Sequence, residues 1–420
     1  MDKKIKILTI SDHPLMPSGV ATQTKYVIDG LLKTGKYKVV SLGGAIKHPN
    51  YQPTRTEEFG EDWTIYPVDG FGDPNIIRSL IRNEKPDILW FMTDPRFYVW
   101  LWNIANEIRP LVPMVYYHVW DNYPYPTFNR PYYISNDVVV TISKLTDDIV
   151  RNVAPDVECH YIPHVVNTDV FAPLPDSEIQ KLKKQNFASW KEDKFLVFWN
   201  NRNARRKQPG AVIYWFNDFL NKVGKDKAVL LMHTEPNDPN GPNLQAIIEE
   251  LGLTNGEVLF SMQKTGIESM NAMYNMADVT INISDAEGFG LATFESLSSG
   301  TPIICTMTGG LQEQVTDGKE WFGIGLEPVA KYAIGSQEVP FIHEDKVSQE
   351  QVVGALEKMY KMSKKERREL GLKGRQHILK NYNRDEIFKK WDDLLTKVYN
   401  ERGSWENRKQ YQRWSIKEVA

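Results

Sequence analysis

The sequence predicts an α/β protein with two doubly wound parallel sheets, and three observations support this fold class. Short apolar runs that favour strands alternate with longer helical patterns along most of the 420 residues, which is typical of parallel sheets with crossover helices. With 41% hydrophobic residues, the chain is too long for one ordinary core. Prolines and polar residues interrupt the alternation near residues 172–192. We therefore expect two Rossmann-like domains facing a central cleft.

The first domain is predicted over residues 1–172. Its candidate strands share short apolar runs and are residues 6–10, 38–42, 64–68, 87–92, 114–119, 138–142 and 160–163. The most continuous of these runs indicate strands that are buried on both faces, as in the interior of a parallel sheet. Together they predict one doubly wound sheet.

The second domain is predicted over residues 173–385, after the proline-containing segment 171–175. Its candidate strands are residues 195–200, 228–233, 257–260, 279–283 and 302–305. From about residue 347 the pattern is helical only. We expect the last segment, 386–420, to pack back across the domain junction through its aromatic positions Trp391, Tyr399, Trp405, Tyr411 and Trp414.

Bulk charge and cysteine content exclude several classes of protein. The net charge of -3 gives no global positive field for nucleic acid or anionic lipid, so any anion site must be local. Cys159 and Cys305 both lie in apolar runs and are expected to be buried, reduced thiols. The apolar run 5–10 is too short for a signal peptide or a transmembrane segment. We expect a cytoplasmic protein.

Residues 284–295 form the most informative segment. They follow the predicted strand 279–283 and open a helix, with Gly288 and Gly290 between Glu287 and Glu295. Glycines let the backbone approach a ligand, and a helix N-terminus presents N–H groups to an anion. We expect the segment to cradle a sugar phosphate. The alternatives are a dinucleotide-binding loop, which lacks its third glycine here, and a tight turn with solvated carboxylates.

Residues 200–207 follow the first predicted strand of the second domain and contain four cations, Arg202, Arg205, Arg206 and Lys207. Doubly wound sheets place ligands at the carboxyl ends of their strands. Cations at this position can stabilise the negative charge that grows on a departing diphosphate. The alternative is a solvated basic turn or a nucleic-acid patch.

The segment 284–295 resembles the conserved stretch of glycosyltransferase family 4, whose hallmark is two glutamates separated by seven residues around a Gly-Phe-Gly core. Glu287 and Glu295 match this spacing. Residues 308–310 with Glu313 resemble the family's following Gly-Gly loop, and residues 161–171 resemble the segment that closes its first domain. The chain departs from the family at Val165 and Asn167, where Gly and Asp are usual.

The resemblance implies a GT-B architecture and a retaining, metal-independent reaction with a nucleotide diphosphate sugar. In the family, an Arg and a Lys at the positions of Arg202 and Lys207 contact the donor diphosphate. It further implies that Glu287 binds the donor sugar and Glu295 the ribose. The backbone that would meet sugar and phosphate belongs to Phe289, Gly290 and Leu291.

Four residues of the first domain are further candidates. Gly19 lies between the first strand and the first helix, where the family has a glycine loop facing the donor phosphates; it could equally be a turn residue. His118 ends a predicted strand and resembles the family's histidine near the donor sugar, although a lone histidine is usually structural. Asp12 and His13 end the first strand and are candidates for the acceptor side.

Aromatic residues gather between positions 116 and 133, among three prolines. Aromatic faces bind sugar rings and bases well, so Trp120 and Asp121 are candidates for acceptor binding. The alternative is a proline-stiffened loop that packs on its own domain. Asp285 and Glu287 have the form of an Asp-x-Asp metal motif, but Glu287 is better used on the donor. We therefore predict no catalytic metal and no cofactor.

These features predict a retaining glycosyltransferase that moves a hexose-type sugar from a UDP- or GDP-sugar to an unidentified hydroxyl acceptor on a glycan, lipid or small molecule. Two alternatives stay open. One is a catalytically silent protein that binds a nucleotide sugar on the same scaffold. The other is a transferase that acts on modified DNA bases, so that nucleic acid would enter only as the acceptor.

Overall fold

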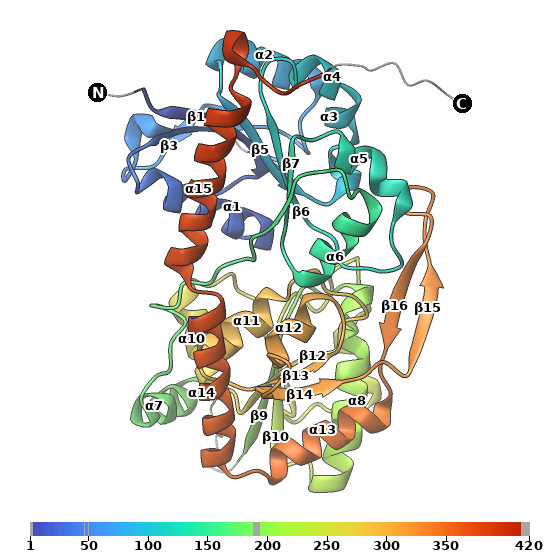
Figure 1. The fold of residues 1–420 in the computed structure, drawn as a ribbon. Helices are drawn as coiled ribbons and strands as arrows, with labels where there is room; N and C mark the ends of the chain where they lie inside the picture. The colour runs from blue at the N-terminus through green and yellow to red at the C-terminus, as the bar shows by residue number, and fades with distance from the viewer. Residues whose placement is uncertain (1–2, 46, 49, 188–193, 413–420) are drawn as a thin grey trace. The chain divides into compact units, whose positions relative to one another are not determined.

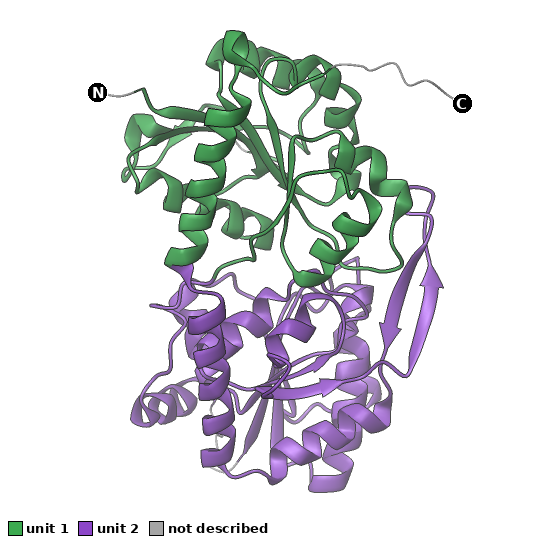
Figure 2. Ribbon diagram, in the orientation of Figure 1, with its two compact units in different colours: residues 1–165, 385–420 green, residues 166–384 purple. Residues whose placement is uncertain are grey.

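The computed structural model describes residues 3–45, 47–48, 50–187 and 194–412, so Trp414 lies outside the described residues. The chain divides into two compact units (Figure 2). Unit 1 comprises residues 1–165 and 385–420, and unit 2 comprises residues 166–384. Each unit contains one large, mainly parallel sheet with helices packed against it (Figure 1). The predicted fold class is confirmed.

The sheet of unit 1 has eight strands in the order β3-β4-β2-β1-β5-β6-β7-β8. They are β1 (Ile5–Asp12), β2 (Tyr37–Gly44), β3 (Thr54–Arg55), β4 (Trp63–Pro67), β5 (Ile88–Thr93), β6 (Met114–His118), β7 (Val138–Thr141) and β8 (Cys159–Tyr161). All neighbours pair in parallel except β3 and β4. Every residue of β5, β6 and β7 is buried, as expected for central strands covered on both faces.

The helices of unit 1 include α1 (Gly19–Leu32), α2 (Pro74–Glu84), α3 (Val99–Asn103), α4 (Ala105–Ile108), α5 (Arg130–Ile134) and α6 (Lys144–Val153), with 3-10 turns η1 (Gly60–Asp62), η2 (Pro95–Phe97) and η3 (Thr127–Asn129). Local sequence sets their starts. The Asp73 carboxylate accepts the N–H groups of Asn75 and Ile76 at α2, and Ser143 forms a capping box with Thr146 at α6.

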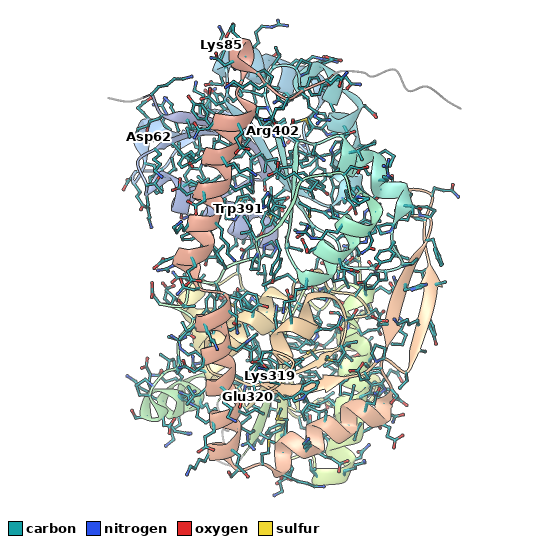
Figure 3. The ribbon with its side chains drawn as sticks, viewed as in Figure 1. Asp62, Lys85, Lys319, Glu320, Trp391 and Arg402 are labelled. Carbon is teal, nitrogen blue, oxygen red and sulfur yellow. The ribbon has the colours of Figure 1, made fainter. Side chains whose placement is uncertain are left out.

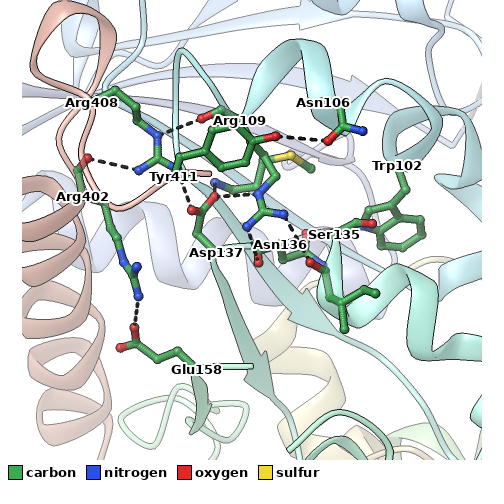
Figure 4. Close-up of polar contacts among 12 residues, drawn as sticks. Trp102, Asn106, Arg109, Ser135, Asn136, Asp137, Glu158, Arg402, Arg408 and Tyr411 are labelled. Carbon is green, nitrogen blue, oxygen red and sulfur yellow. Dashed lines mark hydrogen bonds and ion pairs between the residues drawn. The ribbon is translucent and has the colours of Figure 1, made fainter. Parts of the chain in front are cut away.

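The C-terminal segment belongs to unit 1. Trp391 of α15 (Arg384–Arg402) is 1% exposed (Figure 3), and its ring lies 4.9 Å from the ring of Tyr117. After α15, past η6 (Trp405–Asn407), Arg408 forms a 2.5 Å ion pair with the buried Asp137 (Figure 4). Arg402 pairs with Glu158 at 2.7 Å. Because a buried carboxylate needs a partner, these contacts fix the segment to the first sheet. Its predicted packing across the junction stays a prediction.

The sheet of unit 2 has six parallel strands in the order β11-β10-β9-β12-β13-β14. They are β9 (Phe195–Asn200), β10 (Ala228–His233), β11 (Val258–Ser261), β12 (Val279–Asn282), β13 (Ile303–Thr306) and β14 (Gly323–Leu326). A separate antiparallel hairpin joins β15 (Ala330–Ile334) to β16 (Ile342–Lys346). The sequence predicted β9 to β13 but neither β14 nor the hairpin.

The helices of unit 2 are α7 (Asp176–Asn186), α8 (Pro209–Val223), α9 (Leu244–Glu250), α10 (Ile267–Met276), α11 (Leu291–Ser298), α12 (Gln312–Val315), α13 (Gln349–Lys361) and α14 (Lys364–Asn381), with 3-10 turns η4 (Arg205–Lys207) and η5 (Gly309–Leu311), as far as the chain is described. Residues of α8 and α13, such as Phe216 and Leu356, share one apolar core with Trp199 of β9. This core holds the strand ends that carry the candidate site.

Neither cysteine forms a disulfide. Cys305 is fully buried, as expected, whereas Cys159 is partly exposed because β8 is an edge strand. Among the helices of the described residues, none combines the length and the apolar character that crossing a membrane would require.

Candidate active site

Two segments that the sequence analysis identified as candidates meet at the carboxyl ends of the strands of the unit 2 sheet. Because β9 and β12 are parallel neighbours, their carboxyl ends lie side by side, and residues 201–207 and 283–290 start there. The ammonium of Lys207 forms an ion pair with the carboxylate of Glu287. Their side chains are 11% and 12% exposed. Two predicted site residues that are 80 positions apart are therefore in direct contact.

The charge of Glu287 is stabilised by its surroundings. Burial raises the pKa of this carboxyl, but the charges of Lys207 and Arg206 lower it, and the resulting pKa lies below the ordinary value. Glu287 is therefore an anion at neutral pH and can accept hydrogen bonds from hydroxyl groups.

Glycines bring the backbone close together around Glu287. Gly309 has a φ of +50°, and a Cβ there would collide with the carbonyl oxygen of Glu287. The N–H of Gly310 donates to that same oxygen at 3.0 Å. Gly290, with a φ of +93°, precedes α11, and a Cβ there would lie 2.9 Å from Thr293 Oγ1. This close approach is possible only without side chains.

Leu291 is the first residue of α11, directly after Gly290. The first N–H groups of an α-helix have no acceptor within the helix, so they can meet an anion. The Phe289 side chain is buried and packs 4.9 Å from the ring of Phe294. The ring of Phe289 therefore packs inside unit 2, and only its backbone is placed to contribute to the candidate site at the ends of the strands.

Glu295 lies in a different environment from Glu287. Its carboxylate accepts a hydrogen bond from the Tyr274 hydroxyl at 2.8 Å, and that hydroxyl accepts one from Asn200 at the end of β9 at 2.8 Å. Burial raises the pKa of Glu295 to about 7, although the Tyr274 hydrogen bond lowers it. Glu295 thus changes charge near neutral pH, whereas Glu287 stays ionised.

The four cations of residues 202–207 have different partners. Arg202 is exposed and donates to Asp238 at 2.7 Å. Arg206 donates to the carbonyl oxygen of Ala286 at 2.6 Å, and Arg205 pairs with Glu344. Lys207 is the member that contacts Glu287. The predicted cluster is thus spread over several contacts.

Several buried polar atoms at the carboxyl ends of these strands lack a hydrogen-bond partner among the described residues. They include Asn201 Nδ2, Thr234 Oγ1 and Thr306 Oγ1. Asn201 and Thr234 directly follow β9 and β10, and Thr306 ends β13. Buried polar atoms are normally satisfied, so unsatisfied ones gathered at the carboxyl ends of the strands point to a polar ligand. Thr234 and Thr306 were not among the predicted site residues, although each stands where a predicted strand ends, whereas Asn201 lies within the predicted segment 200–207.

His118 ends β6 in unit 1 and is fully buried. Its Nδ1 lies 2.8 Å from the Tyr116 hydroxyl and its Nε2 lies 2.9 Å from the Tyr133 hydroxyl. Burial lowers the pKa of His118 to about 3. The ring is therefore neutral, and both of its nitrogens already have partners.

The predicted acceptor residues are only partly accessible. Trp120 is 3% exposed, and its indole N–H donates to the carbonyl oxygen of Asn122 at 2.7 Å, so its ring packs within unit 1. Asp121, the next residue, is half-buried.

The start of α1 brings three other candidates together. The Ser18 hydroxyl donates to Asp12 at 2.6 Å and caps the helix, whose first residue is the exposed Gly19. Burial raises the pKa of Asp12. The His13 ring lies 5.2 Å from the ring of His48, and burial and then that neighbour lower the pKa of His13. The end of β1 thus brings an aspartate and a histidine to the start of α1.

Residues of the described part of the chain form no group of three or more His, Cys, Asp or Glu side chains arranged to hold a metal ion. The contacts of Asp285, described below, are to cationic and amide side chains.

Comparison with known proteins finds a family model that matches part of this chain. Residues 180–377 match the model of the glycosyl transferases group 1. The chain is 27% identical over 173 residues to the D-inositol 3-phosphate glycosyltransferase of Paenarthrobacter aurescens, covering 40% of this chain and 41% of that protein. It is 27% identical over 191 residues to the GDP-mannose-dependent alpha-(1-6)-phosphatidylinositol monomannoside mannosyltransferase of Mycolicibacterium smegmatis, covering 44% and 47%. The chain thus spans less than half the length of these relatives.

Solved structures resemble the chain over nearly its whole length. The sucrose-phosphate synthase of Thermosynechococcus elongatus has a TM-score of 0.74 at 16% identity, covering 94% of this chain and 100% of that one. Anabaena HepE, solved with UDP and glucose, has a TM-score of 0.69 at 14% identity with the same coverage. At these identities the likeness concerns the fold, and it confirms the predicted pair of Rossmann-like domains.

Proposed function

We propose, from the match of residues 180–377 to the model of the glycosyl transferases group 1, that the chain is a retaining glycosyltransferase. It moves a hexose-type sugar from a UDP- or GDP-sugar to a hydroxyl acceptor. The observation that supports this most strongly is the contact between Lys207 and Glu287 at the adjoining ends of β9 and β12. A cation for a diphosphate and an anion for sugar hydroxyls stand together there.

The proposed reaction uses these residues in separate roles. The bond from the anomeric carbon to the phosphate oxygen breaks, the acceptor oxygen bonds that carbon on the same face, and the acceptor proton passes to the departing phosphate. Lys207 and Arg202 stabilise the charge on that phosphate. Glu287 holds the sugar hydroxyls, and Glu295 holds the ribose. No metal or protein nucleophile is needed.

The unit 1 candidates take secondary roles in this proposal. His118 would steady the sugar only if the donor replaces one of its tyrosine partners. Asp12, His13 and Asp121 are proposed on the acceptor side, and Trp120 would have to leave its packed position to join them. The proposed location is the cytoplasm.

The proposal is tested with a panel of UDP- and GDP-sugars. Donor hydrolysis is measured as the release of the nucleoside diphosphate. We expect the wild type to turn over at least one donor and Lys207→Met to lose about 100-fold in kcat, as for the loss of one preorganised contact to a developing charge. Lys222→Met is the matched control, because Lys222, on α8, forms an exposed ion pair with Glu357 of α13.

Donor binding without any turnover, with or without acceptors, would contradict the proposal and favour the catalytically silent protein. Transfer only when single-stranded or duplex DNA with hydroxymethylated bases is added would favour the DNA-modifying alternative. Normal turnover by Lys207→Met would remove this residue from the site.

A further inference from the structure

The β15–β16 hairpin stands apart from the six-stranded sheet of unit 2 (Figure 1). Some of its side chains are exposed, with Tyr332 of β15 at 57% and Phe341, directly before β16, at 47%. Glu344, which pairs with Tyr332 across the hairpin, is by contrast only 3% exposed. A buried carboxylate needs compensation by opposite charge.

That compensation comes from the candidate site. Arg205 donates to Glu344 through both terminal nitrogens, at 2.9 and 2.5 Å. The Lys346 ammonium contacts the Asp285 carboxylate and lies 3.2 Å from Glu344. The hairpin backbone also takes part, because the N–H of Asp345 donates to the carbonyl oxygen of Asp285 at 2.8 Å.

Asp285 connects this network to the proposed reactive end. It is 1% exposed, and its carboxylate also accepts the Gln208 amide at 2.7 Å. Its N–H donates to the carbonyl oxygen of Arg206 at 2.8 Å. Asp285 is two residues before Glu287, and Gln208 directly follows Lys207. A shift of Asp285 would therefore move both partners of the Lys207–Glu287 pair.

We propose that Lys346 is a positioning residue, oriented by Glu344, that holds Glu287 in its reactive place by binding Asp285. The hairpin thus helps to position the candidate catalytic residues. This inference rests on the proposed function. It assigns to Lys346 no contact with substrate, so its effect must appear through the orientation of Glu287.

The test compares Lys346→Met, Lys346→Arg and Glu344→Gln with Lys331→Met as matched control. Lys331 lies on the same hairpin, is 60% exposed, and is 3.8 Å from Asp345. We expect Lys346→Met to lower kcat about tenfold, the scale of a small misplacement of a catalytic group, while the donor KM changes less than about twofold. Lys346→Arg, which keeps the charge, should recover most of kcat, and Lys331→Met should match the wild type.

A crystal structure of full-length Lys346→Met gives a readout that does not depend on turnover. We expect the Glu287 carboxylate to be displaced from Lys207 while the sheet is retained. Wild-type kcat in Lys346→Met, or an equal loss in Lys346→Arg, would overturn the proposal. If Lys346→Met does not fold, Glu344→Gln decides: a fall in kcat at constant donor KM supports the proposal, and unchanged kinetics overturn it. A wild type that turns over no donor would refute the proposed function alone, since the displaced carboxylate can still be seen.

Discussion

At the scale of residues, Glu287 and Glu295 are separated by only seven residues yet differ in electrostatic surroundings. Glu287 faces the cations Lys207 and Arg206 and is ionised, whereas Glu295 faces the neutral hydroxyl of Tyr274 and has a pKa near 7. Neighbouring carboxyl groups with different pKa values generally serve different tasks. This difference supports separate roles for them on one ligand.

Substitution of each glutamate should therefore give a different kinetic defect. At pH 8, Glu287→Gln should lower kcat about tenfold or more, each tenfold being about 1.36 kcal/mol of activation free energy. Glu295→Ala should raise the donor KM, because a hydrogen bond to a charged group is worth about 1.5–3 kcal/mol and is equal in ground and transition states. Calorimetry with free nucleoside diphosphate is the control: its affinity should fall for Glu295→Ala alone. The opposite pattern would exchange the two roles.

The raised pKa of Glu295 also predicts how stability depends on pH. Its pKa rises from 4.5 to about 7 on folding, so between these values the folded protein binds more protons than the unfolded chain. The free energy of unfolding should then fall as pH rises from about 5 to 7. This contribution is on the order of 2 kcal/mol and should vanish in Glu295→Gln. Urea unfolding of both proteins at pH 5 to 8 measures it, and parallel pH profiles would show that Glu295 is ionised throughout.

At the scale of elements, the apolar runs predicted the central strands well, because strands buried on both faces are continuous in sequence. The exceptions have physical causes. β14 is short and contains Gly323 and Gly325. In the hairpin, β15 is mostly exposed and β16 ends in the charged residues Glu344, Asp345 and Lys346. Neither provides the apolar signal on which such predictions depend.

The sequence predicted that the glycines of the site lie in turns. It did not predict which of these positions have no room for a side chain. Gly290 has a φ of +93° and stands against Leu311 and Thr293, whereas Gly354 lies exposed in α13 with nothing within 4 Å of an added Cβ. Gly290→Ala should therefore lower the free energy of unfolding by about 1–3 kcal/mol. Gly354→Ala should raise it by about 0.5–1 kcal/mol. Denaturant unfolding of the pair measures the difference, and equal effects would mean that the loop relaxes without strain.

At the scale of the whole molecule, the sequence predicted two parallel-sheet domains and the two segments of the candidate site. It did not predict that Lys207 and Glu287 are partners, because a contact across 80 residues depends on the order of β9 and β12 in the sheet. It also placed His118 at a strand end without its burial between Tyr116 and Tyr133, since those tertiary neighbours leave no local pattern. Candidate site residues could be predicted from their type and position in the sequence. Their contact partners could be identified only from the folded structure.

The anomeric configuration of the first product decides whether the protein transfers the sugar with retention. Time-resolved NMR can follow the anomeric proton while the protein turns over a UDP- or GDP-α-hexose in excess chelator. We expect the α-anomer to appear first, before mutarotation, and turnover to continue without divalent ions because Lys207 and Arg202 meet the diphosphate charge. A β-anomer as first product, or complete loss of turnover that magnesium or manganese restores, would contradict this expectation.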